Sequence, residues 1–217
     1  MRESIQSAEI SIIKEPITKT DDYVLPPLDK KRFTYTLVLD LDETLVHFEA
    51  AERKFKLRPG CLAFLRALAH PYYEIVVFTA ASQDYADFIL NVLDPDHALI
   101  LHRLYRQHTF VTEDGIYLKD LSKLGRDLSK TIIVDNIREN FERQDENGIE
   151  IKTWIGDPQD REFDVLAGFL RGVVEAGVKD VRPIVKMFRT QYEAGVARRE
   201  EAAAYVANQM QHKSPIK

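Results

Sequence analysis

The chain has 217 residues and a formal net charge of −5, and 45% of its residues are hydrophobic, which is typical of a globular protein with a sizeable core. The acidic total argues against non-specific nucleic-acid binding, which needs a basic surface, so we expect no direct contact with nucleic acid. The single cysteine, Cys61, excludes an intramolecular disulfide or a zinc site of several cysteines, and we expect it to be a buried apolar residue.

The sequence begins without the apolar stretch of a signal peptide. Nowhere do about 18 apolar residues run together, so we expect no segment that spans a membrane. With one cysteine and no visible targeting signal, the chain is predicted to be nuclear or cytoplasmic. Residues 1–33, which prolines and charged residues interrupt, predict an irregular lead-in.

Short apolar runs then alternate with helical patterns. The runs predict strands at residues 36–39, 74–78, 98–101, 131–134 and 149–154. Apolar residues at helical spacing predict helices at 62–68, 83–93 and 163–174. In the second helix, the predicted apolar face comprises Tyr85, Phe88, Ile89 and Val92. This alternation is typical of an α/β fold with a doubly wound parallel sheet. Asp114-Gly115, between two β-prone runs, predicts a small hairpin outside that sheet.

The C-terminal part of the chain also predicts helix. An apolar stripe continues through Ile184, Val185, Phe188 and Tyr192, and after Gly195 the sequence is rich in Ala, Glu and Arg. This segment is either an exposed helical face or a helix that binds a partner. We therefore divide the chain into the lead-in, a domain at residues 34–188 and a helical extension at 189–217.

Polar residues follow three of the predicted strands: Asp40 with Asp42, then Thr79, then Asp135. In open α/β sheets, ligands bind at the carboxyl ends of the strands. Asp40 and Asp42 are two positions apart, so they face the same side of an extended chain and repel each other. A bound cation relieves this repulsion, and so does a proton on one of the two acids.

Oxygen ligands without Cys or a His pair indicate a hard cation, for which Mg²⁺ is the default, and Asn136 can complete the site. Such a Mg²⁺ ion suits a phosphate substrate. Asp40 can then act as a nucleophile, with Asp42 as acid and base. Thr79 and Lys119 can bind the phosphoryl oxygens. Each residue alone has a plainer explanation, such as a turn pair or an exposed lysine, and the inference rests on their order along the chain.

This ordered set resembles the haloacid dehalogenase superfamily, and more narrowly the C-terminal-domain phosphatases, also called nuclear-LIM-interactor-interacting-factor-like phosphatases. The resemblance covers about residues 34–188. It rests on Asp-Leu-Asp-Glu-Thr-Leu-Val-His at 40–47, Val-Phe-Thr-Ala at 77–80, Lys-Asp-Leu-Ser-Lys-Leu-Gly-Arg-Asp-Leu at 119–128 and Ile-Val-Asp-Asn at 133–136. The 119–128 block and the 42–47 string are the parts most specific to this branch.

The resemblance implies a role for each of these residues. Asp40 forms an aspartyl-phosphate, and Asp42 is the general acid and base. Mg²⁺ is held by the Asp40 carboxylate, the Asp42 backbone carbonyl and the Asn136 side chain. The remaining implied roles are phosphoryl binding by Thr79 and Lys119, orientation of Lys119 by Asp135, and substrate contacts from Arg106 and Tyr85. For Tyr85, the helical spacing fits core packing equally well.

The activity that the resemblance implies is that of a Mg²⁺-dependent phosphatase acting on phosphoserine or phosphothreonine in proteins, commonly in the tail of RNA polymerase II. Two departures leave alternatives open. Residues 48–57 are a shorter stretch than in the small nuclear members, which use it to grip a Pro-containing peptide. Residues 179–184 are similar to a mitochondrial translocase subunit that serves as a presequence receptor, so a binding module is the alternative. A small-metabolite phosphatase ranks third, because residues 45–58 leave no room for a large cap domain.

Overall fold

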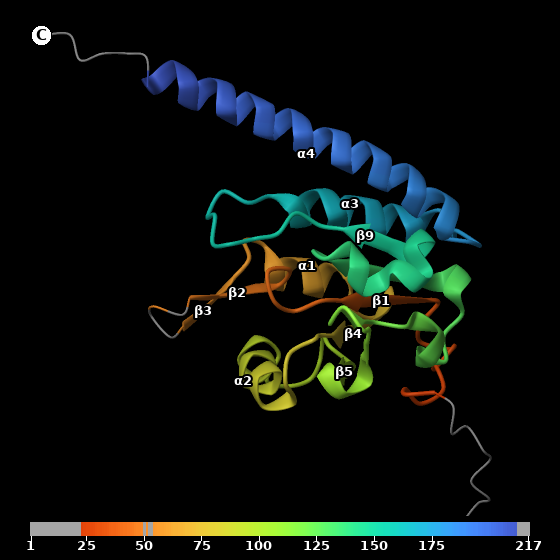
Figure 1. Cartoon of the computed structure of the whole chain (residues 1–217). Coiled ribbons are helices and arrows are strands. Elements are labelled where there is room, and N and C mark those ends of the chain that lie inside the picture. Colours follow the sequence, from red (N-terminus) through yellow and green to blue (C-terminus); the bar gives the residue numbers. More distant parts are fainter. Residues whose placement is uncertain (1–22, 50, 52–53, 212–217) are drawn as a thin grey trace, which may run out of the picture.

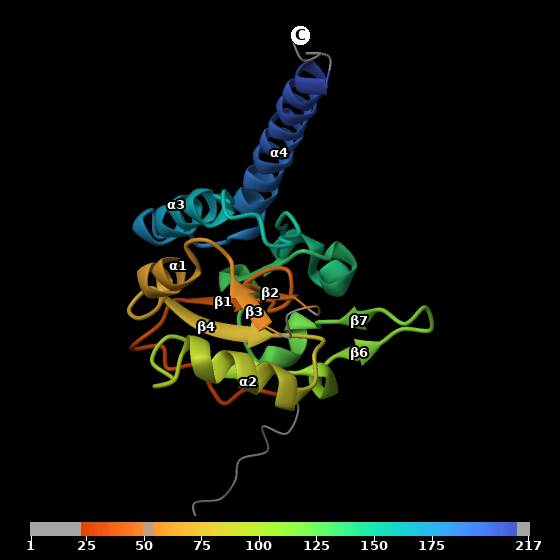
Figure 2. The same ribbon diagram turned by 90° about the vertical axis from the view of Figure 1, so that its left-hand side faces the viewer.

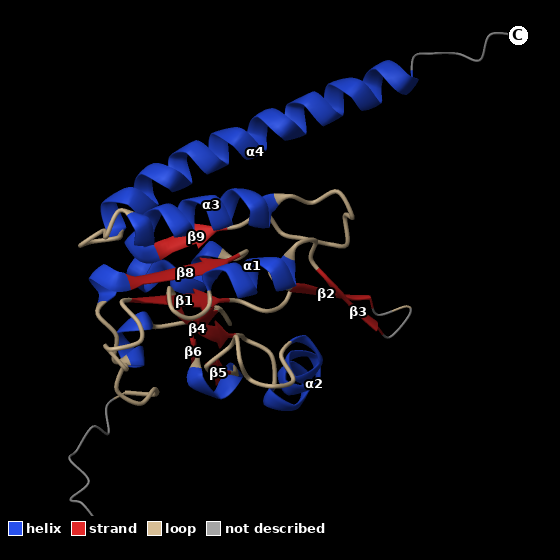
Figure 3. Cartoon of the chain, turned by 180° about the vertical axis from the view of Figure 1, so that it is seen from behind, coloured by secondary structure: helices blue, strands red, loops and turns tan. Residues whose placement is uncertain are grey.

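A computed structural model describes residues 23–49, 51 and 54–211 of the chain (Figure 1). Five parallel strands form its central sheet, in the order β5-β4-β1-β8-β9. Their bounds are Tyr35–Leu39 for β1, Tyr73–Phe78 for β4, His102–Leu104 for β5, Thr131–Asp135 for β8 and Gly148–Glu150 for β9. Figure 3 shows these strands side by side, and the predicted α/β fold with a parallel sheet is confirmed.

The two faces of the sheet are covered by different kinds of helix. The α-helices are α1 (Cys61–Leu68), α2 (Gln83–Leu93), α3 (Glu162–Glu175) and α4 (Arg182–Gln211). Leu37 and Ile75 of the central strands belong to the core that these helices cover. Val38 and Val76 point to the other face, where the 3₁₀ segments η2 (Leu121–Leu124) and η4 (Arg138–Asn147) cover them. Cys61 is buried, as predicted.

Two hairpins lie outside the central sheet. β6 (Phe110–Val111) and β7 (Tyr117–Leu118) form the predicted one, with Gly115 in the left-handed region that its turn requires. Figure 2 shows this hairpin projecting from the body. β2 (Val46–Glu49) and β3 (Lys54–Leu57) form the other, which we did not predict. Its strands are four residues long and mostly half-buried or exposed, so they carry little hydrophobic signal.

The apolar run at 98–101 is not a strand, contrary to the prediction. The backbone N–H groups of Ala98, Leu99 and Ile100 donate to the carboxylate of Asp94, which is buried at the end of α2. These bonds hold the run as a turn, and β5 begins only at His102. A side-chain acceptor of this kind competes with the backbone ladder, and the apolar pattern does not reveal it.

The predicted apolar face of α2 was also partly wrong. Phe88 and Val92 are 63% and 61% exposed. The buried face of the helix is shifted around the helix axis from the predicted one and consists of Ala86, Ile89, Leu90 and Leu93. Phe88 meets Phe55 of the β2-β3 hairpin edge to face, with ring centroids 6.0 Å apart. The unpredicted hairpin therefore gives Phe88 a partner outside the buried face of α2.

The helix α4 contains 30 residues. Val185 and Tyr192 belong to the core, and Phe188 stacks on Phe169 of α3 with ring centroids 4.1 Å apart. Its C-terminal half extends away from the sheet (Figures 1 and 2). The helix continues without a break through residues 188 and 189. Among the described residues, no helix combines the length and apolar content needed to cross a membrane.

A buried ion pair ties β4 to the segment before β8. The Arg126 guanidinium donates to both carboxylate oxygens of Glu74, at 2.6 and 2.7 Å, and the Thr36 hydroxyl donates to the same carboxylate at 2.9 Å. Burial alone would raise the pKa of Glu74, but the hydrogen bonds from Arg126, His102 and Thr36 lower it from 4.5 to about 2. Folding therefore favours the charged form of Glu74.

This ion pair makes stability depend on pH. Because the pKa of Glu74 is lower in the folded chain, its stabilising contribution is complete above the ordinary value of 4.5 and is lost as the pH falls toward 2. Glu74→Gln is expected to lower the free energy of unfolding by about 3–5 kcal/mol at pH 7, since it leaves the buried Arg126 without a counter-charge. The cost should shrink as the pH falls from 5 to 3. Urea unfolding at several pH values measures both effects.

The matched control is Glu175→Gln, because Glu175 pairs with Arg171 on the exposed surface of α3. An exposed pair contributes little, so this variant should unfold like the wild type. Equal effects of the two substitutions would contradict the assignment.

Candidate active site

Three strand ends place acidic and hydroxyl side chains at one edge of the sheet. Asp40 follows β1, Thr79 follows β4, and Asp135 is the last residue of β8. Leu39 pairs with Val77 on one side and Val134 on the other, so the carboxyl ends of the three strands are level. The structure thus brings the predicted strand-end residues together.

Lys119 lies between two of these acids. Its Nζ donates to Oδ1 of Asp40 at 2.5 Å and to Oδ2 of Asp135 at 2.6 Å, and all three side chains are buried. Burial alone would lower the pKa of Lys119, but the two carboxylates raise it above its usual value, so the amine stays charged. Burial also raises the pKa of Asp40, and the charge of Lys119 opposes that shift. Lys119 directly follows β7, so the β6-β7 hairpin positions it between the two acids.

Asp42 lies at the opening of the site, beside Tyr85. The Tyr85 hydroxyl donates to Oδ1 of Asp42 at 2.7 Å. Burial raises the pKa of Asp42, although hydrogen bonds from Tyr85 and Thr79 and the charge of Lys119 oppose the shift. A carboxyl whose pKa is raised in this way holds and releases a proton closer to neutral pH. Tyr85 therefore contacts Asp42 at the candidate site and also packs, partly buried, against the core.

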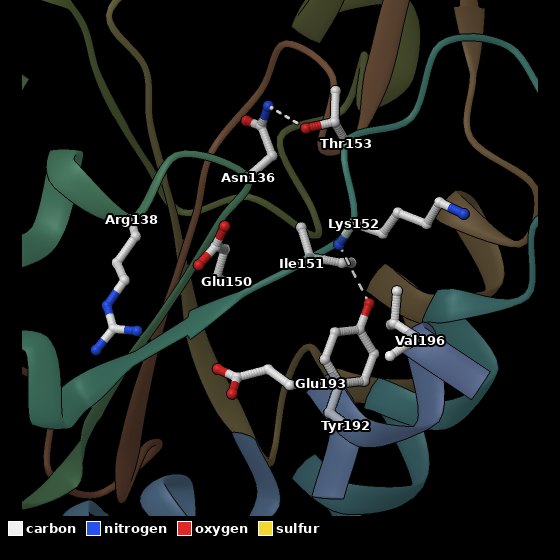
Figure 4. Close-up of a pocket in the computed structure, with 10 residues that line it drawn as sticks. Asn136, Arg138, Glu150, Ile151, Lys152, Thr153, Tyr192, Glu193 and Val196 are labelled. Carbon is white, nitrogen blue, oxygen red and sulfur yellow. Dashed lines mark hydrogen bonds between the residues drawn. The ribbon is translucent and has the colours of Figure 1, made fainter. Parts of the chain in front are cut away.

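Asn136 follows Asp135 directly. Its Nδ2 donates to Oγ1 of Thr153 at 3.2 Å (Figure 4). Its Oδ1 accepts from the Thr44 hydroxyl at 3.4 Å. The loop that carries Thr153 is in turn held by α4, because the Tyr192 hydroxyl accepts from the backbone N–H of Lys152 at 3.2 Å. These contacts orient the amide oxygen of Asn136 toward the loop that follows β1.

The donor set at this edge fits a hard cation. Asp40 offers a carboxylate oxygen, Asn136 an amide oxygen, and the chain between Asp40 and Thr44 its backbone carbonyls, which are the ligand types of Mg²⁺. The combined negative charge of Asp40, Asp42 and Asp135 exceeds the single positive charge of Lys119. This excess of negative charge favours a bound cation. In the described part of the chain, this edge included, no three His, Cys, Asp or Glu side chains are close enough to form a metal site by themselves, so a cation here would need the Asn136 amide oxygen and backbone carbonyls as further ligands.

A hollow of about 540 Å³ opens onto Asp42. Arg106, in the 3₁₀ turn η1 (Arg106–His108), donates from Nε to the Ala80 carbonyl at 2.7 Å and lies over the Tyr117 ring, 5.3 Å from its centroid. The hollow is lined by Asp42, Ala80, Ala81, Ser82, Tyr85, Arg106 and Tyr117. Arg106 and Tyr85, which the resemblance implies as substrate contacts, thus border one opening over Asp42.

The residues after Lys119 have structural roles that explain their motif. Asp120 caps η2 by accepting from the Ser122 N–H at 3.0 Å, and Asp127 caps the 3₁₀ turn η3 (Leu128–Lys130) through the Ser129 N–H at 2.9 Å. Between them, Arg126 forms the ion pair described above. This block therefore fixes the loop that places Lys119.

One contact in the site had no signal in the sequence. Asn140, in the irregular segment η4, donates from its amide to both carboxylate oxygens of Asp135, at 3.3 Å each. No periodic pattern marks this position, because η4 follows neither helical nor strand spacing.

Comparison with known proteins places these residues in a family. The family model described as NLI interacting factor-like phosphatase matches residues 35–182. The mitochondrial import inner membrane translocase subunit tim50 of Aspergillus fumigatus is 43% identical over 182 residues, which cover 82% of this chain and 36% of that protein. CTD small phosphatase-like protein 3 of Caenorhabditis elegans is 41% identical over 180 residues, which cover 75% of this chain and 62% of that protein.

Among solved structures, the essential RNA polymerase II CTD phosphatase Fcp1 shares the fold, with a TM-score of 0.55 and 15% identity. The match covers 65% of this chain and 62% of that one. The chain thus spans less than two thirds of the length of each of these relatives.

The prediction of a nuclear or cytoplasmic protein is contradicted. Translocase subunits of the mitochondrial inner membrane match over 82% of the chain in Aspergillus fumigatus and in Yarrowia lipolytica, at 43% and 41% identity, and they point to the mitochondrion. The low cysteine content does not separate these compartments. The family model spans the sheet, Lys119 and the three acids Asp40, Asp42 and Asp135. The chain belongs to the NLI interacting factor-like phosphatase family.

Proposed function

We propose that the chain is a Mg²⁺-dependent protein phosphatase that acts on phosphoserine or phosphothreonine through an aspartyl-phosphate on Asp40. The observation that carries the proposal is the buried lysine between Asp40 and Asp135, with a second acid, Asp42, at the opening. A purely structural role would not require three acids and a lysine at one edge of a sheet. Membership of a phosphatase family agrees with this interpretation.

Two displacements at phosphorus make up the proposed reaction. A carboxylate oxygen of Asp40 attacks phosphorus, and the bond from phosphorus to the substrate oxygen breaks while Asp42 protonates that oxygen. A water molecule then gives a proton to Asp42 and attacks phosphorus, and the bond to Asp40 breaks. This step releases phosphate and restores both acids.

The chain's own residues balance part of the charge in the site, and a bound cation would balance the rest. Lys119, already bonded to Asp40, offsets the charge of the phosphoryl oxygens, and Thr79 supplies a hydroxyl. The residues that would hold Mg²⁺ are the Asp40 carboxylate, the Asp42 backbone carbonyl and the Asn136 side chain, and the ion would supply further positive charge to the phosphoryl group.

The open hollow favours a phosphoprotein over a small metabolite. Between Leu45 and Arg58, the described residues form the two short strands β2 and β3 and no larger cover. Arg106 is exposed at the rim, where it can meet a phosphoryl oxygen or a neighbouring acidic group of a bulky substrate.

Removal of Mg²⁺ tests the proposal directly. The purified chain is expected to hydrolyse p-nitrophenyl phosphate and members of a phosphopeptide array when Mg²⁺ is present. Hydrolysis should be lost with a chelator and restored by excess Mg²⁺, because the single charge of Lys119 does not balance the acids of the site and the phosphoryl oxygens together. Turnover that persists in the chelator, or no turnover on any substrate, would count against the proposal.

A second candidate is a binding module that serves protein import, which the tim50 relatives favour. It places the chain at the mitochondrial inner membrane and predicts tight binding to a polypeptide partner without turnover. The phosphopeptide array, together with a binding assay on polypeptide partners, separates the two candidates, because a mitochondrial location fits both. A mitochondrial protein that lacks all hydrolysis would favour the second.

A further inference from the structure

Asn140 contacts both partners of the buried ion pair behind the nucleophile. Its side-chain amide donates to Oδ1 and Oδ2 of Asp135, at 3.3 Å each. Its backbone carbonyl accepts from the backbone N–H of Lys119 at 2.6 Å. Asn140 is 7% exposed, so water has little access to these bonds.

The bonds to Asp135 set the direction of its carboxylate. The backbone N–H of Ile137 donates to Oδ1 at 2.9 Å, and Lys119 donates to Oδ2 at 2.6 Å. The amide of Asn140 bridges both oxygens, so the carboxylate plane cannot rotate without losing one of these donors. Oδ2 is therefore held toward Lys119, whose amine also reaches Asp40.

The chemistry of the contact requires a neutral donor. A carboxylate at position 140 would repel Asp135, and a second cation there would compete with Lys119 for the same oxygens. An asparagine satisfies Asp135 without changing the charge of the site.

We propose that Asn140 is a positioning residue for phosphoryl transfer: it acts through Asp135 to hold Lys119 against Asp40. The inference rests on the proposed phosphatase activity. Asn140 contacts neither the nucleophile nor the general acid, so its effect is on geometry. A misplaced Lys119 would balance the developing charge less well, which lowers kcat more than it raises KM.

The chain offers a matched control in the same segment. Asn147, the last residue of η4, is 2% exposed, and its amide donates to the carbonyls of Leu128 and Thr131, at 2.6 and 2.7 Å. Thr131 begins β8, at the end of the strand opposite Asp135. Asn147→Ala therefore removes two buried hydrogen bonds of the same kind, far from Lys119.

The experiment compares kcat, KM and Tm for Asn140→Ala, Asn140→Ser, Asn140→Asp and Asn147→Ala on p-nitrophenyl phosphate with Mg²⁺. Any substitution at position 140 keeps the backbone bond to Lys119, so the variants isolate the side chain. Asn140→Ala is expected to lower kcat by roughly 10- to 100-fold with little change in KM. Asn140→Ser, which keeps a donor, should recover part of the loss, and the isosteric Asn140→Asp should be the least active.

Asn147→Ala should lower Tm while its kcat stays at the wild-type value. The proposal is overturned if Asn140→Ala keeps wild-type kcat, or if Asn147→Ala loses as much kcat as Asn140→Ala. A wild-type chain without turnover would contradict the phosphatase assignment instead. Binding of orthovanadate with Mg²⁺, measured by calorimetry, then tests Asn140 separately, because this ion mimics the charge and geometry of the transition state and needs no turnover. Weaker binding in Asn140→Ala alone supports the role, and equal binding in both variants overturns it.

Discussion

Asp40→Asn is expected to abolish phosphate hydrolysis, with a loss on the order of 10⁶-fold in kcat, the scale of removing a covalent nucleophile. The amide has nearly the same shape as the carboxylate, but its oxygen is a poor nucleophile and carries no charge. Turnover of p-nitrophenyl phosphate measures the loss. A second measurement uses substrate with a labelled phosphoryl group and stops the reaction with acid. The wild-type protein should then carry the label, and Asp40→Asn should not.

The fold should survive this substitution. Lys119 keeps Asp135 as a partner at 2.6 Å, and one of two carboxylates that share a buried lysine is removed. Tm should therefore stay near the wild-type value, which separates lost chemistry from lost structure. Asp127→Asn is the matched control, because Asp127 caps η3 away from the site and asparagine caps equally well. Wild-type turnover in Asp40→Asn would contradict the nucleophile assignment.

The polar residues at the strand ends could be predicted from the sequence because their position follows from a local rule. A buried β-branched run ends where polar side chains begin, and parallel strands bring those ends to one edge. Asp40, Thr79 and Asp135 needed no knowledge of the loops. Their roles in chemistry stay predictions, which the variants described above test.

Lys119 and Asn140 could not be placed by such a rule. Lys119 reaches Asp40 only because the β6-β7 hairpin and the capped turn η2 fix its loop, and spacing along the chain does not contain that geometry. For Lys119, the family motif supplied the missing information. Asn140 lies in a segment without periodicity, and only the structure reveals its contact with Asp135.

The errors at α2 and at residues 98–101 both arose where a specific contact overrides the local sequence pattern. Apolar residues were assigned to the core wherever they matched a period, but Phe88 packs on the unpredicted hairpin instead. At residues 98–100, the carboxylate of Asp94 accepts from the N–H groups that a strand would use. In both places a contact between distant or polar groups overrides the local pattern.

Asp42→Asn is expected to lower kcat by about 10²–10⁴-fold on a phosphoserine peptide, because the leaving oxygen of serine needs a proton. On p-nitrophenyl phosphate, the rate of the first step should fall less, since nitrophenolate leaves without protonation. Hydrolysis of the aspartyl-phosphate also needs Asp42, as the base that takes a proton from water. The phosphoryl group should therefore accumulate on Asp42→Asn in acid-quenched samples, the opposite of the result for Asp40→Asn.

This pair of outcomes assigns the two acids separately. Asp84→Asn is the control, because Asp84 is an exposed acid in the first turn of α2, one residue before Tyr85, and it should leave kcat unchanged. Equal losses on both substrates, with no accumulated phosphoryl group, would remove the acid and base role from Asp42. Its hydrogen bond from Tyr85 would then be a structural contact that holds the loop after β1 against α2.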